Sequence, residues 1–307
     1  MNAVLKPKLA VFPKCYLDQL CVHRTMSVFE WIELAATLGV DGLEFYSGFL
    51  EENETFLNHV KAALETHSLA MPMLCCSPDF TQPDPRRLEE EIKREKQMIQ
   101  IAAFLGGRYC RVLSGQRRPE LTRENGVAQV VRVLKGLLPF AEKCGVVLTM
   151  ENHYKDNYWQ YPEFAQKMDV FVEIVEQIDS PWFGVNFDPS NAILAGEDPL
   201  VLLECVKHRV VSMHASDRYL KSGAIEDLRK EEDSAGYASR LAHGVIGKGM
   251  NDYDRIFSVL HSAGFNSWIS IEDGMGGMDD LRESVHFLKA KIDRHFPGQS
   301  CREEDSQ

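Results

Sequence analysis

Four residues that can bind a metal ion or transfer protons each follow a short apolar run in the second half of the chain. They are Glu151, Asp188, His214 and Glu272, after the runs 146–150, 183–187, 210–213 and 268–271. Apolar runs of this length, bounded by turn or helix signals, are typical of buried parallel strands. Three carboxylates and an imidazole form a mixed oxygen and nitrogen donor set, which suits a hard or borderline divalent ion. The sequence therefore predicts a metal site formed by these four residues.

Two of these ligands, Glu151 and Glu272, could also exchange protons with a substrate. A metal ion would polarise a carbonyl oxygen as a Lewis acid, and a carboxylate would then remove the proton from the neighbouring carbon. We therefore expect both glutamates to be catalytic as well as metal ligands.

Each of the four residues also has a structural alternative. Glu151 and Glu272 could form salt bridges at the rim of a barrel, because a buried carboxylate is costly without a partner. Asp188 precedes Pro189 and Ser190 and could cap the helix that follows. His214 could be a core histidine. The joint occurrence of all four at the same position of consecutive strands favours the metal site.

The elements that must position these residues alternate along the chain. The strands expected before the four described above cover 9–12, 42–45, 69–76 and 109–113. Helical segments are expected at 27–38, 53–67, 85–105, 127–144, 164–178, 199–205, 252–263 and 279–295. Eight strands alternating with eight helices predict an α/β fold, a single (β/α)8 TIM barrel, in which the carboxyl ends of the strands converge on one mouth.

The barrel is expected to span residues 1–296 as one catalytic domain. Ser27 and Glu30 form a capping-box pattern at the start of the first helix. Residues 218–249 form a long, charged, glycine-containing segment after the seventh strand, which we interpret as a lid loop. Residues 297–307 are expected to be a disordered tail.

Composition excludes some classes of partner. The net charge of −12 argues against binding to a nucleic-acid backbone, although a few local arginines could still hold a small anion. No apolar stretch is long enough to cross a membrane and the amino terminus lacks a signal-peptide core, so we expect a cytoplasmic protein. The eight cysteines show no paired zinc spacing and are expected to be buried free thiols.

Short motifs on five strands resemble those of a known family. They are Leu43-Glu44-Phe45, Glu151-Asn152-His153, Asp188-Pro189-Ser190-Asn191, His214-Ala215-Ser216-Asp217-Arg218 and Ile271-Glu272-Asp273. Over residues 8–295 the chain resembles the xylose isomerase-like TIM-barrel superfamily. Within it, the chain is most similar to the sugar phosphate isomerase/epimerase group, which includes epimerases, isomerases and dehydratases of sugars and cyclitols.

The resemblance implies a metal-dependent enzyme of carbohydrate metabolism. Glu151, Asp188, His214 and Glu272 match the family's four metal ligands. Mn²⁺ is the expected ion, with Mg²⁺, Co²⁺ or Zn²⁺ as alternatives. Glu151 and Glu272 match the pair that shuttles the proton in the epimerases. The implied partners are a small sugar or keto-sugar substrate and a second or further copies of the chain, as a homodimer or homotetramer.

Two departures from the epimerase pattern bear on the reaction. Asn191 stands where the epimerases usually have a histidine, and an amide supplies no titrating proton. His153 lies two residues after Glu151, so it should point the same way if the strand persists, although it could instead be a surface loop residue. A histidine here, together with Arg111 and Gly115-Gln116, resembles the dehydroshikimate dehydratases and favours a lyase with His153 as acid or base.

Further residues are expected to bind substrate. Arg111 and Arg218 are candidate clamps for carboxylate or phosphate oxygens, unless they only pair with Glu44 or Asp217. Glu44 could accept a sugar hydroxyl or anchor a neighbouring side chain, and Asn191 could bind a hydroxyl.

His243 precedes Gly247 and Gly249, a pattern that resembles a motif of endonuclease IV. That enzyme's three-zinc site needs further histidines on the third and fourth strands, where this chain has none. We therefore exclude a trinuclear repair nuclease and keep His243 as a candidate substrate-binding residue.

Three functions remain open from the sequence. The first is an isomerase or epimerase of a ketose, a keto-cyclitol or their phosphates. The second is a metal-dependent lyase, either a dehydratase or an enzyme that eliminates the aglycone of a 3-keto-glycoside. The third is a non-catalytic sugar-binding barrel.

Overall fold

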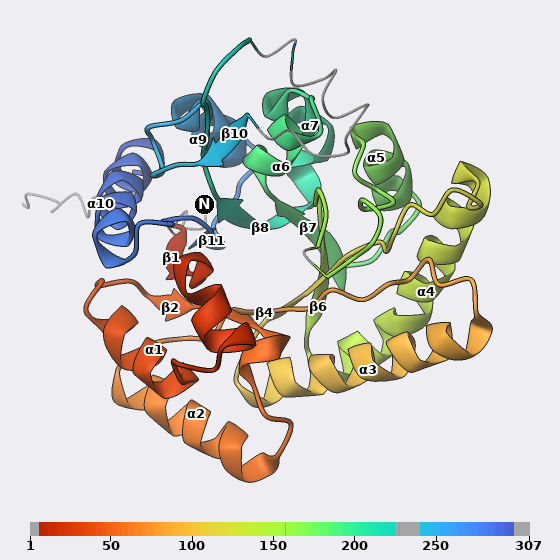
Figure 1. Ribbon diagram of the computed structural model, residues 1–307, viewed down its shortest axis with the longest axis horizontal. Coiled ribbons are helices and arrows are strands. Elements are labelled where there is room, and N and C mark those ends of the chain that lie inside the picture. The colour runs from red at the N-terminus through yellow and green to blue at the C-terminus, as the bar shows by residue number, and fades with distance from the viewer. Residues whose placement is uncertain (1–5, 157, 225–226, 228–239, 298–307) are drawn as a thin grey trace, which may run out of the picture.

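The computed structural model describes residues 6–156, 158–224, 227 and 240–297. A nearly closed barrel of parallel strands lies at its centre, and helices surround it (Figure 1). The strands follow the order β2-β1-β11-β8-β7-β6-β5-β4-β3. The predicted TIM-barrel fold is therefore confirmed.

The second strand of the barrel is divided in two at Glu44. β2 (Gly42–Leu43) pairs with β1 (Lys8–Val11), whereas β3 (Phe45–Tyr46) pairs with β4 (Met73–Cys75). The two short pieces thus take the place of one strand in the eightfold pattern.

The remaining strands agree closely with the apolar runs of the sequence. They are β5 (Tyr109–Val112), β6 (Val147–Glu151), β7 (Phe183–Phe187), β8 (Val210–Ala215) and β11 (Trp268–Ile271). The strand expected over 69–76 is shorter, because the structure has only Met73–Cys75 there. Pro72 has no N–H to donate to a ladder, and its carbonyl accepts bonds from Arg108 and Tyr109 instead.

Helices follow the strands around the barrel. They are α1 (Val28–Ala36), α2 (Glu54–Thr66), α3 (Pro85–Phe104), α4 (Arg123–Cys144), α5 (Met168–Glu176), α6 (Pro189–Leu194), α7 (Pro199–Val206), α9 (Tyr253–Ser262) and α10 (Met278–His295). The capping box of Ser27 and Glu30 is present. α5 begins four residues later than expected from 164–178, and the short α6 is the helix that Asp188 was expected to cap in the structural alternative. No described helix is long and apolar enough to cross a membrane.

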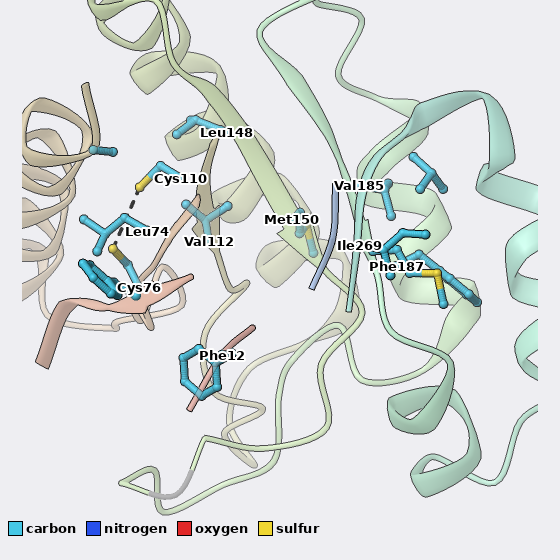
Figure 2. Close-up of a cluster of buried hydrophobic side chains, with 14 of the residues drawn as sticks. Phe12, Leu74, Cys76, Cys110, Val112, Leu148, Met150, Val185, Phe187 and Ile269 are labelled. Atoms are coloured by element: carbon cyan, nitrogen blue, oxygen red, sulfur yellow. Dashed lines mark hydrogen bonds between the residues drawn. The ribbon is translucent and has the colours of Figure 1, made fainter. Parts of the chain in front are cut away.

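Side chains alternate between the two faces of each strand. On β6 Leu148 and Met150 belong to the apolar cluster drawn in Figure 2, whereas the hydroxyl of Thr149 reaches the sulfur of Met73, at 3.3 Å. Since successive side chains of a strand point to opposite faces, Glu151 shares the side of Thr149. The pleat therefore turns the last residue of this strand away from the surrounding helices.

A two-stranded antiparallel hairpin follows β8, formed by β9 (Arg218–Leu220) and β10 (Leu241–His243). Residues 225–226 and 228–239 of the expected lid, and the tail from 298, lie outside the described residues.

Candidate metal and proton-transfer site

The structure brings the four predicted ligands together at the mouth of the barrel. Glu151 ends β6, Asp188 follows β7, His214 lies on β8 and Glu272 follows β11. One donor atom from each of the four lies within 4.8 Å of the others. Glu151, Asp188 and His214 are buried, and Glu272 is nearly so.

The imidazole of His214 is held between carboxylates. Its Nε2 lies 2.7 Å from Oε1 of Glu44, while its Nδ1 lies 3.2 Å from Glu151 Oε1 and 3.1 Å from Glu272 Oε2. Burial alone would lower the pKa of His214, but Glu44, Glu151 and Glu272 raise it well above its ordinary value. A carboxylate on one ring nitrogen is the arrangement that directs the other nitrogen toward a metal ion. Glu44 therefore orients His214, one of the two roles expected for it.

Asp188 both caps a helix and belongs to the ligand group. Its Oδ1 accepts hydrogen bonds from the backbone N–H of Ser190 (2.7 Å), from that of Asn191 (3.2 Å) and from the hydroxyl of Ser216 (2.7 Å). Burial and then repulsion by Glu272 and Glu151 raise the pKa of Asp188 to about 7. A divalent cation among these groups would relieve that repulsion, so the donor set fits such an ion.

Two cations contact the glutamates of the group. Arg111 Nη1 lies 2.7 Å from Glu151 Oε2, and Lys14 Nζ lies 3.0 Å from Glu272 Oε1. Burial would raise the pKa of Glu151, but His214 and Arg111 lower it to about 2. Burial would also raise the pKa of Glu272, but the charges of Lys14 and His214 lower this pKa well below its ordinary value. Both carboxylates are therefore held as anions.

Arg111 pairs with Glu151, and not with Glu44 or Asp217, the two partners considered from the sequence. Lys14 was not anticipated at all, although its position just after the first strand places it at the mouth. Asn191 also contacts the group, since its amide nitrogen lies 3.1 Å from Glu151 Oε1.

An open pocket with a cavity volume of about 70 Å³ lies against this group. Its walls combine aromatic, apolar and charged side chains: Phe12, Lys14, Leu17, Tyr46, Arg111, His153, Lys155, Asp156, Tyr158 and Glu272.

His153 faces this pocket and is not a surface residue. Its Nδ1 lies 3.3 Å from Oε2 of the buried Glu163, whose Oε1 accepts bonds from the backbone and hydroxyl of Ser114 at 2.6 and 2.7 Å. Burial would lower the pKa of His153, but Glu163 and Glu151 raise it. Glu163 lies in an irregular loop without a pattern, so the sequence carried no signal for this pair.

Arg218 and His243 lie opposite each other at the foot of the β9–β10 hairpin. Arg218 is 6% exposed, and its Nε and Nη1 have no hydrogen-bond partner within the described part of the chain. His243 Nδ1 lies 3.1 Å from Asp273 Oδ1, and burial lowers the pKa of His243. Neither is among the pocket walls named above.

The glycines after His243 have a folding role. The carboxylate of Asp217 accepts hydrogen bonds from the backbone N–H of Gly247 and of Gly249, both at 3.0 Å. A Cβ atom at Gly249 would lie 2.2 Å from Asp217 Oδ1. The loop must therefore wrap closely around Asp217, which explains the glycine spacing without any nuclease chemistry.

Comparison with known proteins agrees with the fold. Residues 32–291 match the model of a family described as xylose isomerase-like TIM barrel. The "Uncharacterized protein YfiH" of Bacillus subtilis (strain 168) is 24% identical over 86% of this chain and 94% of its own length. An inosose dehydratase of Bacillus thuringiensis (strain Al Hakam) is 23% identical, but the match covers only 43% of this chain and 42% of the relative.

Solved structures share the fold at low identity. A D-tagatose 3-epimerase-like protein superposes with a TM-score of 0.72 and 16% identity, over 94% of this chain and 98% of its own. The IOLI protein, solved with a bound zinc atom, gives a TM-score of 0.69 and 19% identity over 94% and 98% of the two chains.

Proposed function

The chain belongs to the xylose isomerase-like TIM barrel family, and on that premise we propose that it is a divalent-metal-dependent isomerase or epimerase. The substrate would be a ketose, a keto-cyclitol or one of their phosphates, and the reaction would begin with removal of a proton next to its carbonyl. The observation that carries this proposal is the convergence of Glu151, Asp188, His214 and Glu272 within 4.8 Å beside an open pocket.

The ligand group would hold the ion, for which we favour Mn²⁺. When bound, the ion would supply a Lewis acid that acidifies the carbon-bound proton. Glu272 lines the pocket and is held by Lys14, so its carboxylate is placed to take that proton. Glu151 contacts the same ring nitrogen of His214 as Glu272 does, at 3.2 Å, and in an epimerase it would return the proton.

A second candidate, a lyase, is favoured by the pairing of His153 with Glu163. A partly buried imidazole beside a buried carboxylate, on the wall of the pocket, suits a general acid that protonates a leaving hydroxyl or aglycone. An epimerase has no need of such a group. The relatives include both classes of enzyme by name, so the reaction must be decided by experiment.

The test is proton NMR in D₂O with the Mn²⁺- or Mg²⁺-loaded protein and a panel of ketoses, inososes, dehydroshikimate and 3-keto-glycosides. For Mn²⁺, spectra would be recorded after the ion is removed. Deuterium entering a carbon next to the carbonyl, with every hydroxyl retained, would support the isomerase or epimerase. A new alkene signal with loss of water or aglycone would support the lyase instead.

The variant His153→Ala separates the two candidates independently. For an epimerase we expect turnover to fall by less than about tenfold, whereas a lyase should lose about 10²–10⁴-fold, the usual contribution of a general acid. His59→Ala, on the exposed face of α2, is the matched control and should leave turnover unchanged. A large loss of turnover in His153→Ala, in a reaction that retains every hydroxyl of the substrate, would contradict the role expected for His153 in both the epimerase and the lyase.

A further inference from the structure

A second cluster of metal-competent side chains lies outside the barrel, in the layer between β4, β5 and helix α3. It consists of Cys76, just after β4, Cys110 on β5 and Glu95 on α3. Figure 2 shows the two sulfur atoms facing each other from neighbouring segments. All three residues are buried.

The separations within this cluster resemble the edges of a tetrahedral site. The two sulfurs are 3.9 Å apart, and Cys110 Sγ lies 3.2 Å from Glu95 Oε1. Zinc bonds of about 2.3 Å to sulfur and about 2.0–2.2 Å to oxygen imply edges of roughly 3.8 and 3.5 Å for a tetrahedron. One ion could therefore contact all three side chains with only small movements.

Glu95 lacks a cationic partner. Its hydrogen-bond partner is the Cys110 thiol, and within the described residues no Lys, Arg or His lies within ion-pair distance of it. Its neighbour Arg94 pairs with Glu52 at 3.1 Å instead. Burial raises the pKa of Glu95 to about 7. A buried carboxylate of this kind is costly, and a bound cation is one way to offset the cost.

A cavity leads to the cluster. Cys76 and Glu95 both line it, together with Glu91 and Arg94 of α3. An ion therefore has an entry path, and the fourth position of a tetrahedron could be filled from this cavity by water or a small ligand.

We propose that Cys76, Glu95 and Cys110 form a second metal site, selective for a soft or borderline ion such as Zn²⁺. Thiolate ligands favour such ions over Mn²⁺ or Mg²⁺, which prefer oxygen donors. The ion would join α3 to β4 and β5. Binding displaces the thiol protons, so affinity rises with pH. A disulfide would require the sulfurs to approach to about 2.05 Å, far closer than they are.

The test is a Co²⁺ titration of the reduced full-length protein without oxygen, followed by absorption. Co²⁺ bound to thiolates gives a sulfur-to-cobalt charge-transfer band in the near ultraviolet, which the mouth group cannot give because it contains no cysteine. We expect the band in the wild type and its displacement by Zn²⁺. We expect it to be lost in Cys76→Ser and Cys110→Ser and retained in Cys75→Ser and in the exposed Cys205→Ser.

Absence of the band in the wild type, its persistence in both serine variants, or its loss in Cys75→Ser would overturn the proposal. If a serine variant fails to fold, Glu95→Gln preserves the side-chain shape and both thiols. It should weaken Co²⁺ binding measured by this band by at least about tenfold, as expected for loss of a ligand. An unchanged affinity in Glu95→Gln would equally overturn the site.

Discussion

The mouth of the barrel and the layer beneath α3 both contain buried carboxylates, but they stabilise them differently. At the mouth, Arg111 and Lys14 contact the two glutamates, and backbone and hydroxyl donors hold Asp188. Beneath α3, the one hydrogen-bond partner of the Glu95 carboxylate among the described residues is the Cys110 thiol. The mouth therefore stabilises its carboxylates as anions, which suits the hard ion and the substrate that we propose for it. The outer cluster lacks that organisation and offers sulfur instead.

The largest effect is expected at the mouth. Glu272→Gln removes the carboxylate that faces the pocket, and turnover should fall by about 10³-fold or more because both a base and a metal ligand are lost. The measurement is steady-state turnover with the substrate found by NMR. Glu283→Gln, at an exposed ion pair on α10, is the control and should keep wild-type turnover. A similar loss of turnover in Glu272→Gln and Glu283→Gln would contradict a specific role of the mouth in turnover.

The loop between β4 and α3 should contribute to stability through Asp79. Asp79 accepts bonds from Arg118, Gln116 and Thr81, and its backbone N–H reaches Glu91 beside the outer cavity. Asp79→Asn should lower the free energy of unfolding at pH 7 by about 2–4 kcal/mol, because it leaves Arg118 without its charged partner. Chemical denaturation measures this, and Asp254→Asn at the surface should cost less than about 1 kcal/mol.

The same aspartate gives a pH dependence of defined sign. Burial would raise the pKa of Asp79, but Arg118, Gln116 and Thr81 together lower it below the usual 3.8. The contribution of the Asp79 carboxylate to the free energy of unfolding is therefore present above pH 3.8 and is lost as the pH falls through the folded-state pKa. The stability difference between wild type and Asp79→Asn should shrink on acidification below that value. A constant difference would show that the pKa is not depressed.

An intermediate effect is expected for the residue that orients His214. Glu44→Gln should weaken binding of Mn²⁺ by about 10–100-fold, the usual cost of losing a carboxylate that directs a ligating histidine. Isothermal titration with Mn²⁺ measures it, and the exposed Glu65→Gln on α2 is the matched control. The Co²⁺ thiolate band should be unaffected, which separates this change from the outer cluster.

The smallest effect is expected for Lys14→Gln. Lys14 holds Glu272 from the pocket side, so kcat/KM should fall by about tenfold, corresponding to one charge-assisted hydrogen bond. Lys248→Gln, at an exposed ion pair, should have no effect. Wild-type kinetics in Lys14→Gln would show that Glu272 is positioned by other contacts.

The sequence predicted the mouth because its residues follow a geometric rule. Glu151 ends a parallel strand, Asp188 and Glu272 directly follow one, and His214 is the last residue but one of another. The carboxyl ends of the barrel strands converge regardless of the loop conformations. The division of the second strand at Glu44 was not predicted, because two-residue strands have no periodic signal.

Partners that depend on loop paths or on helix packing escaped prediction. Lys14 begins a three-residue 3-10 helix and Glu163 lies in a loop, and the contacts of both depend on the paths of these short segments. Glu95 meets Cys76 and Cys110 only because α3 packs on β4 and β5 in one register. The cysteines have no paired spacing in the sequence, so the sequence gave no indication of the outer cluster.

The central claim is that the metal ion held at the mouth acidifies a carbon-bound proton. The most direct test is deuterium incorporation into the substrate in D₂O, measured by NMR. The reaction is run with chelator-treated protein and again after Mn²⁺ has been added back. The Mn²⁺ is then removed before the spectra are recorded. We predict that incorporation next to the carbonyl stops without the ion and returns with it in the wild type, but does not return in His214→Ala. Incorporation that continues in the chelated protein, or that returns in His214→Ala as it does in the wild type, would contradict the account.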